Sequence, residues 1–512
     1  MSLDLAFGIA RSGLLATQKA LANVSQNITN AETPGYTRKS GAAESLTAVS
    51  MPLGIRMGEA QRAVDQALIA ERDARGGEAA GAAVRERLLA GIEAMHGAAG
   101  AGESLGDTVT ALRTSLLGLR AAPGEGGLQR DVVNAARQVA IRFGELAGAV
   151  SSARQQAQDG IVQEVARINE GLREIAQLTH LIKGDHVRGL GTGDLEDQRD
   201  TALARLSQSL PVRALHQSDG GIVLVAKGGI GLPLEALGNA LSSNIASLGP
   251  DAFHGAGGTI PPILLGGVDI TRQLTGGGRL GEYVALRDST LPRFQAELDL
   301  AAAHLARRFD AQGLRLFTGS SGQVPNTSLA YHDPASGQIG FAQQIRLNDA
   351  VALNPALLRD GTHAVADTPG GPTAFTPNAS DGPAGFATLL DRMIDHSLGE
   401  TVRAGVAWNT IPSGGLGADG SLSSPFIPPR SIERYAAALT GIHTADRASA
   451  TALRERAEGL KRGLDARFQR ESGVDPDAEM ASLVQLQNAY AANARVMNTA
   501  QQMWEQLQSI GR

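Results

Sequence analysis

The chain has 512 residues, 42% of them hydrophobic, and its formal net charge is −6. This length exceeds what one hydrophobic core organises and predicts about three domains, while so small a net charge argues against nucleic acid or an anionic membrane surface as the partner. The absence of cysteine excludes disulfides, thiolate metal ligands and cysteine nucleophiles, and it is compatible with chance or with export into an oxidising space.

The first element is a predicted helix over residues 3–30 that carries an apolar seam. Its apolar residues recur at alternating steps of four and three, the spacing of a coiled coil. With Ala10 and Thr17 completing this spacing, the seam residues are Leu3, Phe7, Leu14, Leu21, Val24 and Ile28. Asp4 and Arg11 interrupt the apolar run, so we do not expect a cleaved secretory signal. No apolar stretch approaches the roughly 18 residues of a membrane-spanning helix.

Between the two ends, predicted helices alternate with turn-rich segments. Residues 33–36 end the first helix, and residues 38–60 are predicted to be irregular or extended. Further helices are predicted over residues 60–95, 107–120, 131–146, 151–181, 194–210, 280–312 and 431–471, with a short one at 384–398. A glycine-rich loop is predicted over 180–193, small β structure over 212–275, and a turn-rich insert over 318–425.

The last predicted helix carries a seam that matches the first. Its residues are Leu483, Leu486, Tyr490, Met497, Trp504 and Leu507. The two seams have similar lengths, about 40 Å at roughly 1.5 Å per residue, so we expect them to pair with each other. A chain that runs out and back pairs them antiparallel. The expected facing pairs are Phe7 with Trp504, Leu14 with Met497, and Leu21 with Tyr490.

These elements predict a mainly α-helical fold with β-containing inserts. We expect an elongated rod in which the terminal helices form an antiparallel coiled coil and other helices form a bundle. The predicted domains are residues 1–40 with 475–512 as the terminal coiled coil, 41–211 with 276–317 and 426–474 as the helical rod, 212–275 as a small β-rich insert, and 318–425 as a variable outer insert. Seams at both ends are typical of an assembly part rather than a soluble enzyme.

Motifs that carry chemistry are nearly absent. Gly189, Gly191 and Gly193 follow a helix rather than a strand and lack the Lys-Ser/Thr of a phosphate-binding loop. His180 and His186 fall in a predicted loop and are interpreted as solvated rather than as metal ligands. We therefore expect no catalytic residue, cofactor or metal.

An acidic cluster over residues 194–200 has two interpretations. Asp194, Glu196, Asp197 and Asp200 have the composition of a paired-carboxylate site. Arg199 lies among them, which favours a salt-bridged helix start in which the acids cap the helix N-terminus.

Two terminal segments resemble signatures of the flagellar axial proteins, a family of rod, hook and hook-associated proteins. The segment over residues 25–38 is similar to the N-terminal signature N-I-A-N-A-x-T-P-G-Y, with Thr29 in place of the usual alanine. Its matching residues are Asn27, Asn30, Thr33, Pro34, Gly35 and Tyr36. Residues 472–500, which include Glu479, are similar to the C-terminal signature.

Two central segments narrow the resemblance to the hook-associated members. Residues 194–200 look like their D-L-x-D-Q-R-D helix, through Asp194, Asp197, Gln198, Arg199 and Asp200. Residues 277–288 look like their G-G-x-L-G segment that ends in R-D. The resemblance covers about residues 1–315 and 430–512 and does not extend over 318–425.

The resemblance implies a structural subunit of the bacterial flagellum, at the junction between hook and filament, that is not an enzyme. It implies export through the flagellar type III channel without a cleaved signal, and an extracellular location. The implied partners are copies of itself in a ring, the hook protein below, a second junction protein above, and a cytoplasmic export chaperone on the C-terminal helix, with no nucleic acid and no membrane.

Two alternatives stay open. A hook or distal-rod subunit of the same family fits both terminal signatures but not the helix over 194–200. A rod-associated cell-wall hydrolase needs a carboxylate pair in a cleft. Its candidates in the insert are Asp333, Asp349, Asp360, Asp367 and Asp381, which have no adjacent Glu and no aromatic saccharide platform.

Overall fold

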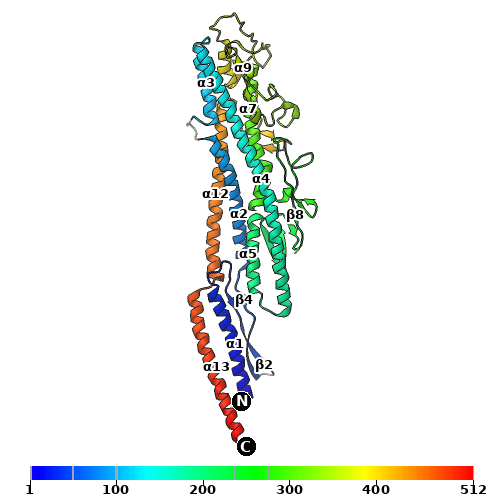
Figure 1. Ribbon diagram of the computed structural model, residues 1–512, viewed down its shortest axis with the longest axis vertical. Helices are drawn as coiled ribbons and strands as arrows, with labels where there is room; N and C mark the ends of the chain where they lie inside the picture. Colours follow the sequence, from blue (N-terminus) through cyan, green and yellow to red (C-terminus); the bar gives the residue numbers. More distant parts are fainter. Residues whose placement is uncertain (1–2, 49–50, 98–101, 236, 275, 511–512) are drawn as a thin grey trace. The chain divides into compact units, whose positions relative to one another are not determined.

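The structure, a computed structural model, describes residues 3–48, 51–97, 102–235, 237–274 and 276–510. The chain divides into two compact units (Figure 1). The first unit contains residues 1–80, 166–241 and 455–512, and the second contains residues 81–165 and 242–454. Helices α2 (Gln66–His96), α4 (Gly126–Arg188) and α12 (Ile432–Ser472) contribute to both units. The predicted class, mainly α-helical with small β-sheets, is confirmed, whereas the four predicted domain boundaries stay a prediction.

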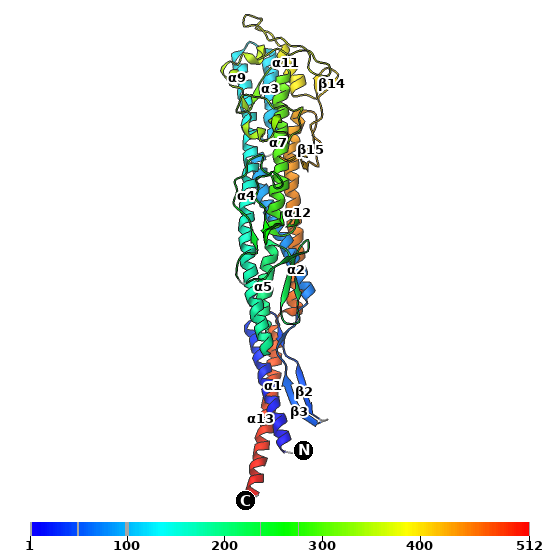
Figure 2. The same ribbon diagram turned by 90° about the vertical axis from the view of Figure 1, so that its right-hand side faces the viewer.

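The two ends of the chain pair within the first unit. Helix α1 (Leu3–Thr29) and helix α13 (Pro476–Ile510) lie side by side and run in opposite directions (Figures 1 and 2). Ala10, Leu14, Ala20 and Val24 are buried on α1, and Ala500 is buried on α13. The predicted antiparallel pairing of the terminal helices is therefore confirmed.

The register of this pair differs from the predicted one. A Cβ on Gly13 would lie 3.0 Å from Nδ2 of Asn493, and the side chains of Asn27 and Glu479 hydrogen bond at 3.3 Å. Both pairs fit a single register. In it, each residue of α1 faces a residue of α13 that comes about five positions earlier, or roughly 7.5 Å along the axis, than in the predicted register, where Leu14 faces Met497. Seams of equal length leave this displacement undetermined. A glycine that admits the Asn493 side chain, together with the buried contact of Asn27, determines it.

The segment after α1 is extended, as predicted. Strand β1 (Lys39–Ser40) pairs with β4 (Gln61–Arg62), and β2 (Ala43–Ala48) pairs with β3 (Met51–Met57), both antiparallel. Strand β3 packs on α1 at Gly54, where φ is 126° and a Cβ would lie 2.0 Å from Oγ of Ser12. Both the backbone conformation and the close approach therefore require glycine at this position.

The rest of the first unit consists of helix α5 (Gly193–Ser209), parts of the three long helices, and a small sheet. The sheet is antiparallel, with β6 (Ile222–Ala226) between β5 (Val212–His216) and β7 (Ile230–Leu232). Leu68 and Ile69 of α2 pack with Phe468 of α12 in one hydrophobic cluster. This cluster joins segments that are about 400 residues apart in the chain.

The second unit is organised around helix α7 (Leu291–Ala311). Leu298, Leu305 and Phe309 of this helix are fully buried. This unit also contains α3 (Leu105–Ala121), α6 (Gly278–Ala285) and the π-helical turn η2 (Leu286–Thr290), which contacts α7. The shorter elements are β8 (Leu241–Ser242, at the boundary of the units), β9 (Leu264–Leu265), β10 (Val268–Asp269), η1 (Thr271–Leu274), β11 (Phe317–Thr318), η3 (Pro334–Ser336), α8 (Phe341–Gln344), β12 (Arg346–Leu347), α9 (Asp349–Leu353), α10 (Leu357–Asp360), α11 (Thr388–Arg392), η4 (Met393–Ser397), β13 (Thr401–Arg403), β14 (Val406–Ala407), β15 (Gly414–Leu416) and β16 (Leu422–Ser423).

The predicted helix boundaries between residues 126 and 193 are wrong. One continuous helix, α4, replaces two predicted helices and most of the predicted glycine-rich loop. Gly144 and Gly148 lie inside the continuous helix at or near the predicted break, although glycine in a helix interior costs about 1 kcal/mol relative to alanine. Buried residues on both sides, among them Phe143, Leu146 and Val150, offset that cost through packing.

The segment over 318–425 consists of short helices and strand pairs that pack on α7. Asp299 of α7 holds part of it, because its carboxylate accepts the N–H groups of Gly340 and Ala342 and the hydroxyl of Tyr331, each at 2.8 Å. Across the residues that the structure describes, we find no helix with the length and hydropathy that a membrane crossing requires.

Candidate functional site

The chain leaves α1 through a tight turn formed by the N-terminal signature. The N–H of Thr33 donates to the Asn30 carbonyl at 2.9 Å, and the N–H of Tyr36 donates to the Thr33 carbonyl at 3.1 Å. Gly35 has φ of 84°, and a Cβ there would lie 2.5 Å from Oγ1 of Thr201 on α5. Glycine is therefore needed both for the backbone conformation and for the close approach to α5.

Asn27, which is 1% exposed, links the end of α1 to strand β1. Its Nδ2 donates to the Lys39 carbonyl at 2.9 Å, and its Oδ1 accepts the Lys39 N–H at 3.1 Å. The same Oδ1 accepts the hydroxyl of Tyr36 at 3.0 Å. The amide thus pairs with both backbone groups of one strand residue. A buried amide with these partners is costly to replace, and it fixes the direction in which the chain leaves the helix.

Asp197 of α5 accepts four hydrogen bonds from the segment that follows the turn. Its Oδ1 accepts Oγ1 of Thr37 at 2.6 Å and Nη1 of Arg62 at 2.9 Å. Its Oδ2 accepts the Thr37 N–H at 3.1 Å and Nζ of Lys39 at 2.8 Å. The side chains of Lys39, Arg62 and Asp197 are only 5%, 4% and 8% exposed. Two buried cations therefore depend on this carboxylate for their charge balance.

Neighbouring acids complete the charge balance. Nζ of Lys39 also lies 2.8 Å from Oδ1 of Asp194, and Nη1 of Arg62 donates to Asp200 at 2.7 Å. Burial by itself lowers the pKa of Lys39, but its hydrogen bonds with Asp194 and Asp197 outweigh this effect and leave the pKa raised. The pKa of Arg62 is raised in the same way, against the effect of its burial. Both cations are therefore held in the charged form.

The acidic cluster is a salt-bridged helix start, as predicted, but the predicted capping is wrong. The N-cap of α5 is Thr192, whose side chain makes no cap hydrogen bond within the described part of the chain and donates to Glu196 at 2.7 Å. Arg199, the predicted partner of the acids, donates to the Gly220 carbonyl at 2.8 Å instead. Lys39 and Arg62, which come from a distant segment, pair with the acids instead of Arg199. No local pattern in the sequence indicates these ion pairs.

The C-terminal signature joins the same network through Glu479. This residue lies buried in the first turn of α13, where it accepts Nε of Arg38 at 2.6 Å and Nδ2 of Asn27 at 3.3 Å. Three signatures that are far apart in the sequence therefore meet. We call this set of residues the motif junction: Asn27, Tyr36, Thr37, Arg38, Lys39, Arg62, Asp194, Asp197, Asp200 and Glu479.

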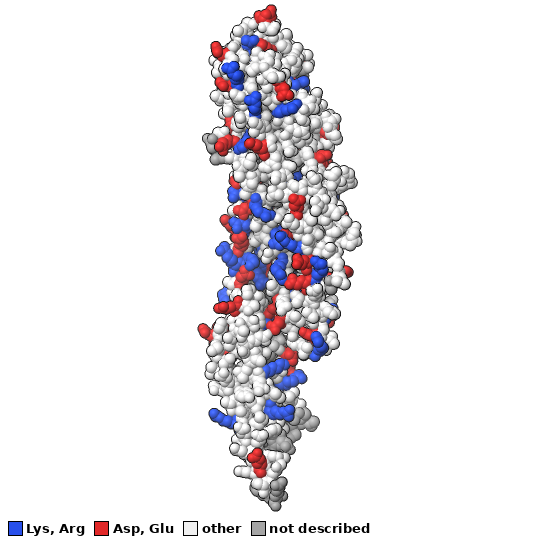
Figure 3. Space-filling view, in the orientation of Figure 1, with Lys and Arg blue, Asp and Glu red and all other residues white. Residues whose placement is uncertain are grey.

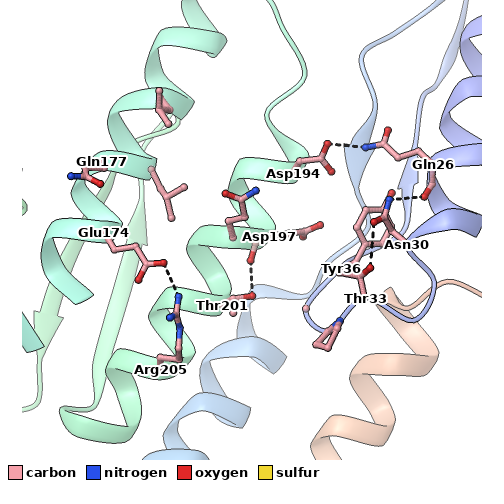
Figure 4. A pocket seen from close by; sticks show the side chains of 15 residues that line it. Gln26, Asn30, Thr33, Tyr36, Glu174, Gln177, Asp194, Asp197, Thr201 and Arg205 are labelled. Carbon is pink, nitrogen blue, oxygen red and sulfur yellow. Dashed lines mark hydrogen bonds and ion pairs between the residues drawn. The ribbon is translucent and has the colours of Figure 1, made fainter. Parts of the chain in front are cut away.

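A groove of about 600 Å³ opens beside the motif junction. It lies between the turn at residues 33–36 and helices α4 and α5 (Figure 4). Its walls are held by the hydrogen bond from Gln26 to Asp194, at 2.8 Å, and by the ion pair of Arg205 with Glu174, at 2.7 Å. Pro34 and the exposed Gln198 line it without belonging to the network.

A further largely buried acid, Asp73 on α2, interacts electrostatically with Asp200 of the motif junction. Burial, opposed by Arg72 and assisted by Asp200, raises the pKa of Asp73 to about 6. A folded-state pKa above the unfolded value means that protonated Asp73 favours the folded state, and that this stabilisation is lost as the pH rises through about 6.

We expect Asp73→Asn to raise the free energy of unfolding of the first unit at pH 7 by at most about 3 kcal/mol, at roughly 1.4 kcal/mol per pKa unit. The gain over the natural chain should grow between about pH 4 and pH 6 and then level off. Urea unfolding at several pH values measures it. A difference that is independent of pH would show that Asp73 titrates normally.

The other central signature, at residues 277–288, lies in the second unit and is structural. A Cβ on Gly281 would lie 2.6 Å from the Leu274 carbonyl, so the chain can pack this closely only with glycine. Arg287 is fully buried, with its Nε 2.7 Å from Asp288 and its Nη1 donating to Gln158 at 2.8 Å. This signature therefore connects α6 and η2 to α4.

The seam residues divide into covered and exposed ones. Leu14 and Val24 are 8% exposed, whereas Phe7, Tyr490 and Trp504 are 36%, 37% and 47% exposed. The residues of intermediate exposure are Leu21, Ile28, Leu483, Leu486 and Met497. The side chains of Leu3 and Leu507 lie outside the described part. The expected aromatic contact between Phe7 and Trp504 is therefore wrong, and the pair of helices leaves its aromatic seam residues open.

Other sequence candidates have structural positions. His180 and His186 lie within α4 rather than in the predicted loop. Over the described residues, no group of three or more histidines and acids is arranged to hold a metal ion. In the insert, Asp333 caps η3, while Asp360 and Asp367 form ion pairs with arginines.

Comparisons with known proteins show which protein families this chain resembles. The flagellar hook-associated protein FlgK helical domain family matches residues 90–323, and the flagellar basal body rod FlgEFG protein C-terminal family matches residues 466–510. Flagellar hook-associated protein 1 of Bacillus subtilis is 21% identical over 538 residues, 97% of this chain and 96% of that protein. The chain is therefore similar to the FlgK-like hook-associated proteins.

One further relative and one solved structure are similar to parts of the chain. Flagellar hook-associated protein 1 of Salmonella typhimurium is 25% identical over 314 residues, or 59% of this FlgK-like chain, and the chain spans about half of that relative's length, 55%. The solved flagellar hook junction protein FlgK from Burkholderia pseudomallei is 23% identical, with a TM-score of 0.40 over 50% of this chain and 45% of that chain. The resemblance drawn from the sequence signatures is confirmed.

Proposed function

We propose that this chain is a structural subunit of the junction between the hook and the filament of the bacterial flagellum. The antiparallel pair of α1 and α13 carries this proposal, because it presents exposed aromatic seam residues at the meeting point of both chain ends. The motif junction supports it by holding the entry to α13, through Glu479, against the end of α1.

The surface of α13 has the character of a contact surface. Met480, Val484, Val496, Met503 and Trp504 are each 47–53% exposed. On the face drawn in Figure 3, the part that contains α1 and α13 carries few charged side chains. Fully burying a large apolar side chain contributes roughly 1.5–3 kcal/mol, so contacts with neighbouring subunits would stabilise this surface considerably.

In this proposal the subunit packs against copies of itself in a ring, with the hook protein below and a second junction protein above. The chain reaches this extracellular position through the flagellar type III channel. A cytoplasmic chaperone covers α13 before export, since an exposed apolar helix surface favours aggregation until it is buried. The subunit performs no catalysis.

The second candidate is a hook or distal-rod structural subunit of the same family. The similarity of residues 466–510 to rod proteins favours it, whereas the match of residues 90–323 to the hook-associated helical domain favours the junction. No observation favours a cell-wall hydrolase.

Deletion of the gene should separate the two structural roles. We expect cells without this chain to build complete hooks that carry no filament, and to release filament subunits into the medium. Electron microscopy of the cell surface measures this. Reintroducing the natural chain should restore filaments. Cells that lack hooks altogether would assign the chain to the hook or the distal rod.

A further inference from the structure

Two buried side chains on one face of α7 carry nitrogens that have no hydrogen-bond partner in the described part of the chain. Arg308 is 1% exposed, and its Nη1 donates to the carbonyls of Gly399 and Arg430 at 3.2 and 2.6 Å. Its Nε and Nη2, and Nε2 of His304, are buried and have no hydrogen-bond partner among the described residues. The two side chains are four residues apart and therefore neighbours on the helix. Buried donors without partners are rare in folded proteins and call for an explanation.

The unpaired nitrogens of Arg308 have the geometry of an anion clamp. The Nε–H and Nη2–H bonds point in parallel, which is how a guanidinium binds both oxygens of a carboxylate. Burial lowers the pKa of Arg308 to about 9, so the group is still a cation at neutral pH. Asp310, the nearby acid, is instead paired with Arg307 at 3.0 Å and with Arg315 at 2.9 Å. Water can accept from the fork but does not neutralise its charge.

The His304 side chain adds a neutral donor or acceptor beside the fork. Burial, with a smaller contribution from Arg308, lowers the pKa of His304 to about 3, so the imidazole is uncharged at pH 7. A neutral imidazole can present an N–H to one oxygen of an anion that the fork holds.

Both side chains line a cavity of about 510 Å³ between α7 and two segments of the insert, residues 363–372 and 402–410. Cavities of roughly 300–1,000 Å³ take small molecules. Trp408 covers the guanidinium of Arg308, whose central carbon lies 5.0 Å from the ring centroid.

The rest of the lining mixes short polar side chains with apolar ones, such as Val365 and Val402, and with the ion-paired Asp310. Hydroxyl and amide groups come from Thr327, Ser328, Asn409 and Thr410. Such groups hydrogen bond with hydroxyls, and they lie in the same cavity as the guanidinium fork. The cavity therefore brings the guanidinium fork together with neutral polar groups on its walls that can hold hydroxyls.

We propose that this cavity binds a small hydroxylated carboxylic acid of the sugar-acid class. The carboxylate binds the Nε–Nη2 fork of Arg308, His304 donates to one of its oxygens, and the polar walls hold the hydroxyls. Because the fork is buried under Trp408, binding moves the indole away from the guanidinium. The inference concerns the insert over 318–425 and does not depend on the junction role.

Tryptophan fluorescence tests this proposal on the full chain. The chain has two tryptophans, so Trp504→Phe leaves Trp408 as the only one. We expect D-galacturonate to change its fluorescence saturably, and D-galactose, which lacks the carboxylate, to leave it unchanged. Acetate and inorganic phosphate should bind more weakly, because one lacks the hydroxyls and the other is not planar. No saturable response to galacturonate, or an equal response to galactose, would overturn the proposal.

Variants locate the site. Arg308→Met, which replaces the cation by an apolar side chain of similar length, should weaken galacturonate binding roughly 10- to 100-fold. Arg308→Lys keeps the charge without the fork and should weaken it as well. Ala407→Phe, at an exposed lining position, should block the cavity while Arg308 stays in place.

Arg434→Met is the matched control, since Arg434 lies in the same unit, is 75% exposed and pairs with Glu400. It should bind galacturonate like the natural chain. Circular dichroism confirms that each variant is folded. Full affinity in Arg308→Lys, or unchanged affinity in a folded Ala407→Phe, would contradict the assigned position.

Discussion

Replacing Asp197 with alanine should lower the free energy of unfolding of the first unit by about 3–5 kcal/mol. The change removes the acceptor of four hydrogen bonds and leaves Lys39 and Arg62, which are 5% and 4% exposed, short of negative charge. Breaking one side of a buried ion pair costs more than the pair itself contributes, because the remaining charge stays desolvated. Hydrogen exchange of the α5 and β1 backbone amides in increasing urea measures the loss.

Asp194→Ala is the matched control for this experiment. Asp194 lies on the same helix and also contacts Lys39, at 2.8 Å, but its side chain is 55% exposed. Water replaces its interactions, so we expect a loss of no more than about 1 kcal/mol. If the two variants lost equal stability, the contribution of the motif junction to the free energy of unfolding would depend on how many charges it contains and not on how deeply they are buried.

Changing both Leu483 and Leu486 to aspartate should abolish filament growth while the second unit stays folded. Both side chains lie on the seam of α13 and are partly covered in the pair with α1. A carboxylate at either position loses apolar contact and must be desolvated when subunits pack, at a cost of roughly several kcal/mol. Electron microscopy of filaments and swarming assays measure assembly, and circular dichroism of the purified variant measures folding.

The control adds the same two charges elsewhere on α13. Gln485→Asp with Gln487→Asp places them at exposed polar positions of the same turns. We expect filaments to form in this variant. Normal filaments in the Leu483 and Leu486 variant would remove the assembly role that we assign to the seam.

The signatures of the motif junction were recognisable in the sequence, but the contacts of Arg62 were not. Asn27 and Gly35 belong to the segment over residues 25–38, whose amino-acid sequence resembles the N-terminal signature of the axial proteins. Lys39 directly follows that segment, which is a weak signal for it. Arg62 has no local signal at all, because its partners on α5 are more than 130 residues away in sequence. An ion pair between distant segments leaves no periodic pattern.

The sequence by itself determined the two seam helices, the mainly helical class and the family, because helical periodicity and family signatures are local properties of the chain. It also indicated that the ends pair with each other, since their seams match in length, and that they pair antiparallel, since the chain runs out and back. Only the tertiary structure decided the register, in which Gly13 admits Asn493 and Asn27 contacts Glu479. It likewise decided that α4 continues through glycines and that Lys39 and Arg62, rather than Arg199, balance the acids of α5. The physical reason is the same in each case: side-chain packing and buried charge pairing depend on which distant residues come together, and local patterns do not encode that.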